Sequence, residues 1–147
     1  MRVLIIGASS FIGNNVYNYF QKNTDHELFG TYYHNKINGK YIYMDVTDNS
    51  QIEKMLNSVK PDTVLWIAGS KNICACEESF DFAKTINTLP IENFIKISTS
   101  NKLLPHFVFF STDYVFDGKK GNFTDTDIPN PSTNYGISNW LAEKRLT

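Results

Sequence analysis

The amino-terminal segment constrains the fold more than any other part of the chain. Val3 to Ile6 is a short, continuous apolar run that ends at Gly7, as expected for a strand buried in a parallel sheet. Apolar residues then recur at helical spacing from about residue 11 to 22. The first glycine permits a tight turn, and a second, Gly13, lets the helix pack closely on the sheet. The segment therefore predicts a strand, a turn and a helix, the opening unit of an α/β fold.

The rest of the chain continues this alternation. Further strands are predicted over residues 27–33, 41–44, 63–67 and 107–110. Asp48, with Gln51 three residues later, resembles a capping box that opens a second helix. A long helix is predicted over about 79–101, bent at Pro90, and a last helix begins near Asn134. Residues 34–39 and 112–133 are predicted loops.

Strands that alternate with helices call for a parallel sheet with right-handed crossovers. We expect a doubly wound, Rossmann-like α/β domain over residues 1–147, with five strands in the order 3-2-1-4-5. The net charge of −1 gives no argument for binding nucleic acid or an anionic membrane surface. The apolar runs are far shorter than the roughly 20 residues that span a bilayer. Cys74 and Cys76 form a lone C-x-C without a second ligand pair, so no metal is expected, and a cytoplasmic location is the default.

The first turn is a candidate phosphate site. A helix amino terminus offers free N–H groups and a positive dipole end to a diphosphate. Ser10 is also placed to cap this helix and to donate its hydroxyl to phosphate. The competing interpretation is a plain helix-entry turn. The residues predicted to hold the diphosphate are Gly7, Ser9, Ser10, Phe11, Ile12 and Gly13.

The end of the second predicted strand bears on which dinucleotide would bind. It lacks the acidic residue that grips a ribose 2′-hydroxyl, and His34 and Lys36 favour a 2′-phosphate, hence NADP over NAD. Both are equally well explained as solvated loop residues. Asp45, after the third strand, is placed to accept a hydrogen bond from an adenine amino group, or else is an ordinary turn aspartate.

The segment Ser111-Thr112-Asp113-Tyr114-Val115-Phe116-Asp117-Gly118 follows the fifth predicted strand directly. It resembles the extended short-chain dehydrogenase/reductases, and most closely the dTDP-4-dehydrorhamnose reductase group. The resemblance runs along nearly the whole chain, through Asp45-Val46-Thr47-Asp48, Pro61-Asp62-Thr63-Val64, Ala68-Gly69, Asn87, Tyr135-Gly136 and Glu143. It implies an NADP or NAD cofactor, with Val46, Ala68 and Gly69 at the cofactor site, and a nucleotide-sugar substrate.

The resemblance also implies catalytic roles. The position of Thr112 hydrogen-bonds the substrate carbonyl, that of Tyr135 donates a proton to its oxygen as hydride reaches carbon, and that of Asn87 supports a water relay. The family carries Tyr-x-x-x-Lys, whereas this chain has Asn139 in place of the lysine. Tyrosine titrates near 10, so a nearby cation is needed to bring it towards working pH. Activity of this chain on its own is therefore doubtful.

The family's members are usually nearly twice this length, and their carboxy-terminal half supplies most of the sugar-nucleotide pocket. This chain corresponds to the cofactor-binding half, so its fifth strand is expected to be an apolar sheet edge. We expect a second copy, another chain, or residues 112–133 with the last helix to cover this edge. The alternatives to a reductase are a non-catalytic dinucleotide-binding regulatory module, as one family member is, another extended family enzyme such as a sugar epimerase or dehydratase, or a degenerate product.

Overall fold

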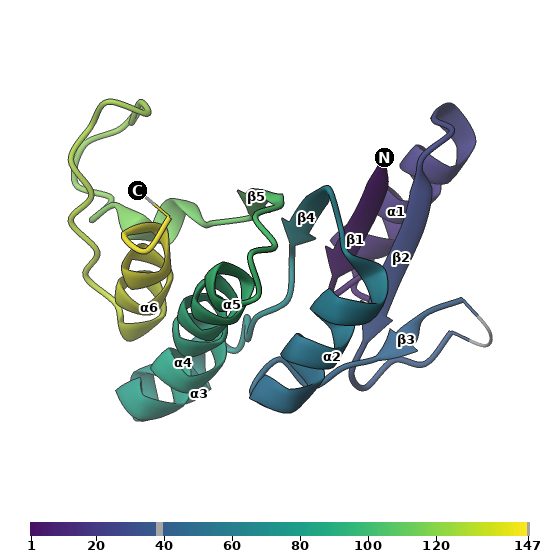
Figure 1. The fold of residues 1–147 in the computed structure, drawn as a ribbon. Helices are drawn as coiled ribbons and strands as arrows, with labels where there is room; N and C mark the ends of the chain where they lie inside the picture. The colour runs from purple at the N-terminus through teal and green to yellow at the C-terminus, as the bar shows by residue number, and fades with distance from the viewer. Residues whose placement is uncertain (38–39, 147) are drawn as a thin grey trace. The chain divides into compact units, whose positions relative to one another are not determined.

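A computed structural model describes residues 1–37 and 40–146 (Figure 1). Its strands are β1 (Arg2–Ile6), β2 (Glu27–Tyr32), β3 (Ile42–Tyr43), β4 (Thr63–Trp66) and β5 (His106–Phe109). Its helices are α1 (Phe11–Asn23), α2 (Asn49–Val59), α3 (Ile73–Glu78), α4 (Phe80–Asn87), α5 (Leu89–Ser100) and α6 (Asn134–Glu143), with a 3₁₀ turn, η1, at Asp113–Val115.

The five strands form one parallel sheet in the order β3-β2-β1-β4-β5, which confirms the predicted topology. From β1 the chain moves to β2 and β3 on one side of the sheet, and it then crosses back to β4 and β5 on the other side of β1. Because both crossovers are right-handed, α1 and α2 lie on opposite faces of the sheet (Figure 1). The central strand, β1, is thus the point at which the winding reverses.

The chain divides into two compact units. The first, which we call the sheet unit, comprises Met1–Gly69 and Asn93–Phe110, and it holds all five strands. The second, which we call the helical unit, comprises Ser70–Glu92 and the chain from Ser111 onward. Within the helical unit, α6 packs against α3, α4 and η1.

The sheet unit is built around side chains that alternate between the two faces of β1 and β4. Val3, Ile5 and Leu65 share a buried cluster with Tyr17 of α1. The opposite face carries Trp66, whose ring packs edge-on against Phe94 of α5 at a centroid distance of 5.6 Å. Because both faces of these strands are covered, their sequences are continuous apolar runs rather than alternating ones.

The predicted strands agree with the structure to within about a residue at each end, but the predicted helix over 79–101 is wrong. The structure has two helices there, α4 and α5, which are separated at Thr88. Pro90 lies in the first turn of α5, where its missing N–H costs nothing, so the proline starts a helix rather than bending one. The helix α3 was not predicted, and the predicted loop over 34–39 extends into residues 38–39, outside the described part.

The structure also bears on three further predictions: the loop over 112–133, the cap of the second helix and the lack of a membrane-spanning segment. The predicted loop over 112–133 contains the short turn η1. Asp48 caps α2 as predicted, by accepting from the Ser50 N–H at 2.9 Å. In the described residues, no helix has both the length and the apolar character needed to cross a bilayer.

Candidate functional site

In the turn between β1 and α1, two glycines lie very close to neighbouring backbone atoms. Gly7 has a φ of +86°, in the left-handed region that favours glycine, and a Cβ there would lie 2.8 Å from the Ala68 nitrogen. A Cβ on Gly13 would lie 2.2 Å from the Gly7 carbonyl oxygen. Both glycines are therefore required for the turn to fit between the ends of β1 and β4 and the first turn of α1.

The hydrogen bonds of this turn determine which amides are free. The Ser10 N–H donates to the Gly7 carbonyl at 3.1 Å, and the Gly13 N–H donates to Ser10 Oγ at 3.0 Å. Ser10 is thus the amino-terminal cap of α1, as predicted. No acceptor among the described residues takes the N–H groups of Phe11 and Ile12. Within the first turn of helix α1, these two amides are the donors that can receive an anion.

The turn is also tied to the neighbouring strand β2. Thr31 accepts the Gly7 N–H through its hydroxyl at 3.0 Å and the Ser9 N–H through its carbonyl at 3.3 Å. Sequence reasoning missed Thr31, because nothing in its surroundings marks a partner 24 positions away.

Beyond β2, His34 and Lys36 are exposed, and the His34 ring lies 4.2 Å from that of Tyr33. No carboxylate stands at the end of β2. A cation, Lys40, packs instead against α1: its Nζ lies 4.7 Å from the Tyr17 ring centre and donates to Asn18 Oδ1 at 2.5 Å. Lys36 is therefore the exposed cation among the described residues of this loop, and the His34 imidazole is exposed as well.

The other predicted cofactor residues lie at the carboxyl ends of β3 and β4. Asp45 Oδ1 accepts from the Thr47 N–H at 2.9 Å and from its hydroxyl at 2.7 Å, the geometry of a turn aspartate. Val46 beside it is half-buried. Ala68 forms the wall against Gly7, and Gly69 is exposed at the end of the sheet unit. An adenine contact of Asp45 stays a prediction.

In the helical unit, Tyr135 lies in the first turn of α6 and is 9% exposed. Burial raises the pKa of its phenol, and the nearby Cys76, Asp113 and Tyr114 raise it further, while a hydrogen bond with the Thr112 side chain lowers it in part. The net direction is upward. The phenol is thus held in its protonated form, the opposite of what an activating cation would do.

Asn139 does not act on the Tyr135 phenol. Its amide Nδ2 donates to the Tyr135 backbone carbonyl at 2.9 Å, and the side chain is only 6% exposed. The amide is therefore used within helix α6. No lysine or arginine among the described residues contributes to the shift of the Tyr135 pKa.

Asn87 connects three segments of the helical unit. Its Oδ1 accepts from the Ser70 N–H at 2.8 Å, and its Nδ2 donates to Ser138 Oγ at 3.1 Å. Ser138 Oγ in turn donates to the Tyr135 carbonyl at 2.8 Å. The structure gives Asn87 a role in holding α6, and its participation in a water relay stays a prediction.

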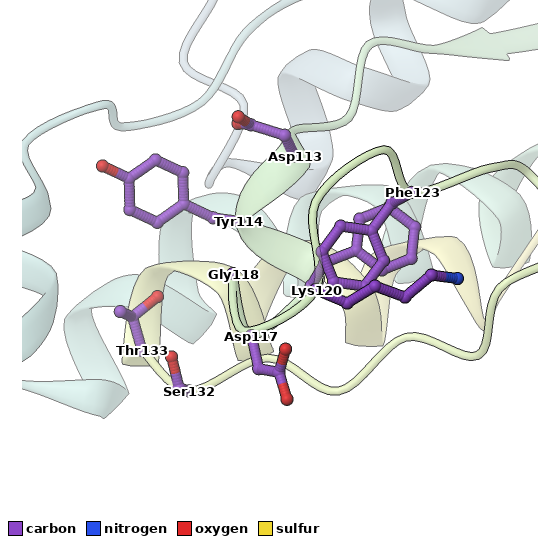
Figure 2. A pocket seen from close by; sticks show the side chains of 9 residues that line it. Asp113, Tyr114, Asp117, Gly118, Lys120, Phe123, Ser132 and Thr133 are labelled. Atoms are coloured by element: carbon purple, nitrogen blue, oxygen red, sulfur yellow. The ribbon is translucent and has the colours of Figure 1, made fainter.

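Thr112 caps the turn η1, since its Oγ1 accepts from the Tyr114 N–H at 3.2 Å. An open pocket of about 630 Å³ adjoins this turn (Figure 2). Its lining residues are Asp113, Tyr114, Phe116, Asp117, Gly118, Lys120, Phe123, Ser132 and Thr133. Several of their polar groups already pair within the loop: Lys120 with Asp127 at 2.5 Å, and Asp117 with the Lys119 N–H at 3.0 Å. Among the described residues, no cluster of three or more metal-ligating side chains occurs.

Comparisons with known proteins agree with this geometry. The family model for the RmlD substrate binding domain matches residues 1–147. The chain is 27% identical over 145 residues to methionine adenosyltransferase 2 subunit beta of Xenopus tropicalis, covering 99% of this chain and 42% of that protein.

Solved structures give the same relationship. A hypothetical dTDP-4-dehydrorhamnose reductase from Sulfolobus tokodaii superposes with a TM-score of 0.88 at 32% identity, over 99% of this chain and 51% of that one. A dTDP-4-dehydrorhamnose reductase from Clostridium acetobutylicum superposes with a TM-score of 0.83 at 28% identity, over 99% and 49%.

The chain thus spans about half the length of the relatives that it matches. The matched family model covers every residue, and the sheet has the predicted strand order. The chain belongs to the RmlD substrate-binding-domain family, the dTDP-4-dehydrorhamnose reductase-like branch of the extended short-chain dehydrogenase/reductases.

Proposed function

We propose that the sheet unit binds a nicotinamide dinucleotide, with the diphosphate on the free amides of Phe11 and Ile12. These amides are the observation that carries the proposal. They stand at the amino terminus of α1, directly after the central strand at which the winding of the sheet reverses. Unpaired N–H groups and the positive end of the helix dipole together favour a diphosphate at this position.

The charge of the loop after β2 supports NADP over NAD. His34 and Lys36 are exposed there, and no carboxylate is present to accept a ribose 2′-hydroxyl. Lysine attracts a 2′-phosphate at neutral pH, whereas the described residues of this loop offer the ribose 2′-hydroxyl of NAD no carboxylate. The proposed ligand of the sheet unit is therefore NADP, with NAD as the weaker one.

Calorimetric titration and thermal unfolding with NADP⁺, NAD⁺ and dTDP test this proposal. At 1 mM ligand, a dissociation constant of about 10 µM would stabilise the folded protein by about 2.7 kcal/mol. We expect NADP⁺ to give the largest increase in Tm and NAD⁺ a smaller one. If neither dinucleotide binds at millimolar concentration, the proposal is wrong.

Reduction of a nucleotide-linked 4-keto sugar is the second candidate, since the chain carries Thr112 and Tyr135 of the family's motif. The structure of α6 argues for binding without efficient turnover. Asn139 brings no charge, its amide is bonded to a backbone carbonyl, and the pKa of the Tyr135 phenol is raised. A general acid typically contributes on the order of 10²–10⁴-fold in rate, so most of that acceleration is absent.

Asn139→Lys tests this second candidate, with the uncharged Asn139→Met as its control. Oxidation of NADPH with a dTDP-linked 4-keto sugar is followed by absorbance. If only the cation is missing, the lysine variant raises the rate and the methionine variant does not. Equal rates in the two variants would show that the cation is not what limits reduction.

A partner is proposed for the edge of the sheet. No described strand lies beyond β5, and Phe110 and Leu104, which flank it, are 39% and 79% exposed. Exposed apolar edge strands pair readily with other chains. We propose that a second copy or another polypeptide adds to this edge. Sedimentation equilibrium tests this, and a strictly monomeric protein at high micromolar concentration would contradict self-association.

A further inference from the structure

Two backbone N–H groups of the turn between β1 and α1 donate hydrogen bonds to Thr31 of β2. Thr31 is the fifth residue of β2 and only 2% exposed. Its hydroxyl accepts the Gly7 N–H at 3.0 Å, and its carbonyl accepts the Ser9 N–H at 3.3 Å. The side chain and the backbone of one buried residue therefore hold two donors of the turn, the N–H groups of Gly7 and Ser9.

The conformation of Gly7 explains why a side chain is needed there. The β1–β2 ladder ends with the pairing of Ile5 and Gly30, and Gly7, two residues beyond it, has a positive φ. A backbone carbonyl of β2 does not meet the Gly7 N–H beyond that point, and the threonine hydroxyl replaces it. Without the Thr31 hydroxyl, the Gly7 N–H loses its hydrogen-bond partner.

The two hydrogen bonds to Thr31 also help to orient the Phe11 and Ile12 amides, which follow in the chain. Gly7 and Ser9 are held on Thr31, and Ser10 is held on the Gly7 carbonyl at 3.1 Å. These three bonds constrain the chain before it enters the helix at Phe11. Preorganised donors bind an anion more tightly than donors that must first be ordered.

We propose that Thr31 is a positioning residue for the bound diphosphate, acting through the Gly7 and Ser9 amides without touching the ligand. This inference rests on the proposed binding of a dinucleotide by the sheet unit. It assigns to β2 a role in diphosphate binding, besides the contact proposed above between the loop after β2 and the ribose end of the ligand.

Thr31→Val tests the inference, because valine keeps the branched shape and the carbonyl and removes only the hydroxyl acceptor. Thr31→Ser keeps the acceptor and is the rescue variant. Thr63→Val is the matched control: Thr63 begins β4 at the opposite end of the sheet, and its hydroxyl has no hydrogen-bond partner among the described residues. The dissociation constant of NADP⁺ is measured for all four proteins by calorimetry, with urea unfolding to monitor the fold.

Loss of one net hydrogen bond from the turn should weaken NADP⁺ binding about three- to tenfold in Thr31→Val. Thr31→Ser and Thr63→Val should bind within about twofold of the wild type. If Thr31→Val binds as tightly as the wild type, or if Thr31→Ser is equally weak, the inference is overturned while the proposed function stands. A wild-type protein that binds no dinucleotide removes both.

Discussion

Gly13→Ala places a methyl group where helix α1 packs directly against the backbone of the turn that follows β1. The added Cβ would lie 2.2 Å from the Gly7 carbonyl oxygen and 2.8 Å from the Ala8 Cα. Both neighbours are backbone atoms, so no flexible side chain can move aside. Non-bonded heavy atoms prefer separations of about 3.5–4.0 Å, so α1 must move by about 1 Å from the turn.

The expected loss of stability follows from two opposing effects. Overpacking against backbone costs about 3 kcal/mol at the upper end of its usual range. Alanine in a helix recovers about 1 kcal/mol relative to glycine. The net loss of about 2 kcal/mol lowers the Tm of a domain of this size by roughly 4–8 °C.

The affinity for NADP⁺ should fall as well. A helix displaced by about 1 Å no longer presents the Phe11 and Ile12 amides in the geometry of good hydrogen bonds, and each lost charge-assisted bond costs about 1.5–3 kcal/mol. We therefore expect a loss of more than tenfold, measured by calorimetry alongside thermal unfolding. The control is Gly121→Ala, where a Cβ meets nothing within 4 Å. If Gly13→Ala melts and binds like Gly121→Ala, the close-packing argument is refuted.

Three further predictions concern single side chains. Ser10→Ala removes the cap of α1 and should cost about 1 kcal/mol of unfolding free energy in urea. Asn87→Ala leaves a backbone N–H and the Ser138 hydroxyl without their partner, and should cost about 1–3 kcal/mol in the same assay. The pKa of Asp127 is lowered to about 2, first by its hydrogen bond with Lys120 and then by the Thr124 N–H. Because the folded pKa is below the unfolded value, loop order should be present above about pH 4 and lost as pH falls through 2, as followed by carboxyl NMR titration.

Each of these has a result that would contradict it. For Ser10→Ala and Asn87→Ala, an unfolding free energy within about 0.5 kcal/mol of the wild type is what a solvated surface residue would give. For Asp127, a carboxyl that titrates near pH 4 would mean that the contacts with Lys120 and Thr124 do not persist in solution. Asp127→Asn serves as the control that removes the titration altogether.

The sheet could be predicted from the sequence because its determinants are local and apolar. Strands β1 and β4 each contain a continuous hydrophobic run, at residues 3–6 and 64–66, and the right-handed crossover rule then leaves few strand orders. The cap of α1 was predictable for a similar reason: Ser10 precedes the first helical residue and its side chain suits only a few partners.

The division at Thr88 could not be read from the pattern. Apolar residues continue at helical spacing on both sides of it, and a proline within such a pattern fits either a kink or a new helix. Helix α3 has only six residues, too few for a periodic signal.

Part of the candidate site could likewise be predicted from the sequence, and part could not. The residue types of the first turn predicted a phosphate site, but identifying Phe11 and Ile12 as the free donors required every hydrogen bond of the turn. The absence of a lysine at position 139 is evident from the sequence, whereas the bond of Asn139 to the Tyr135 carbonyl depends on the packing of α6.

The most direct test of the account is a titration of ¹⁵N-labelled protein with NADP⁺, followed by the backbone amide resonances. Binding of the diphosphate at the amino terminus of α1 should move the Phe11 and Ile12 resonances downfield and slow their exchange with solvent, by far the largest effects in the sheet unit. The Gly13 amide, already bonded to Ser10, should change less. If NADP⁺ binds and the Phe11 and Ile12 resonances stay where they are, the diphosphate is held elsewhere and the account is wrong.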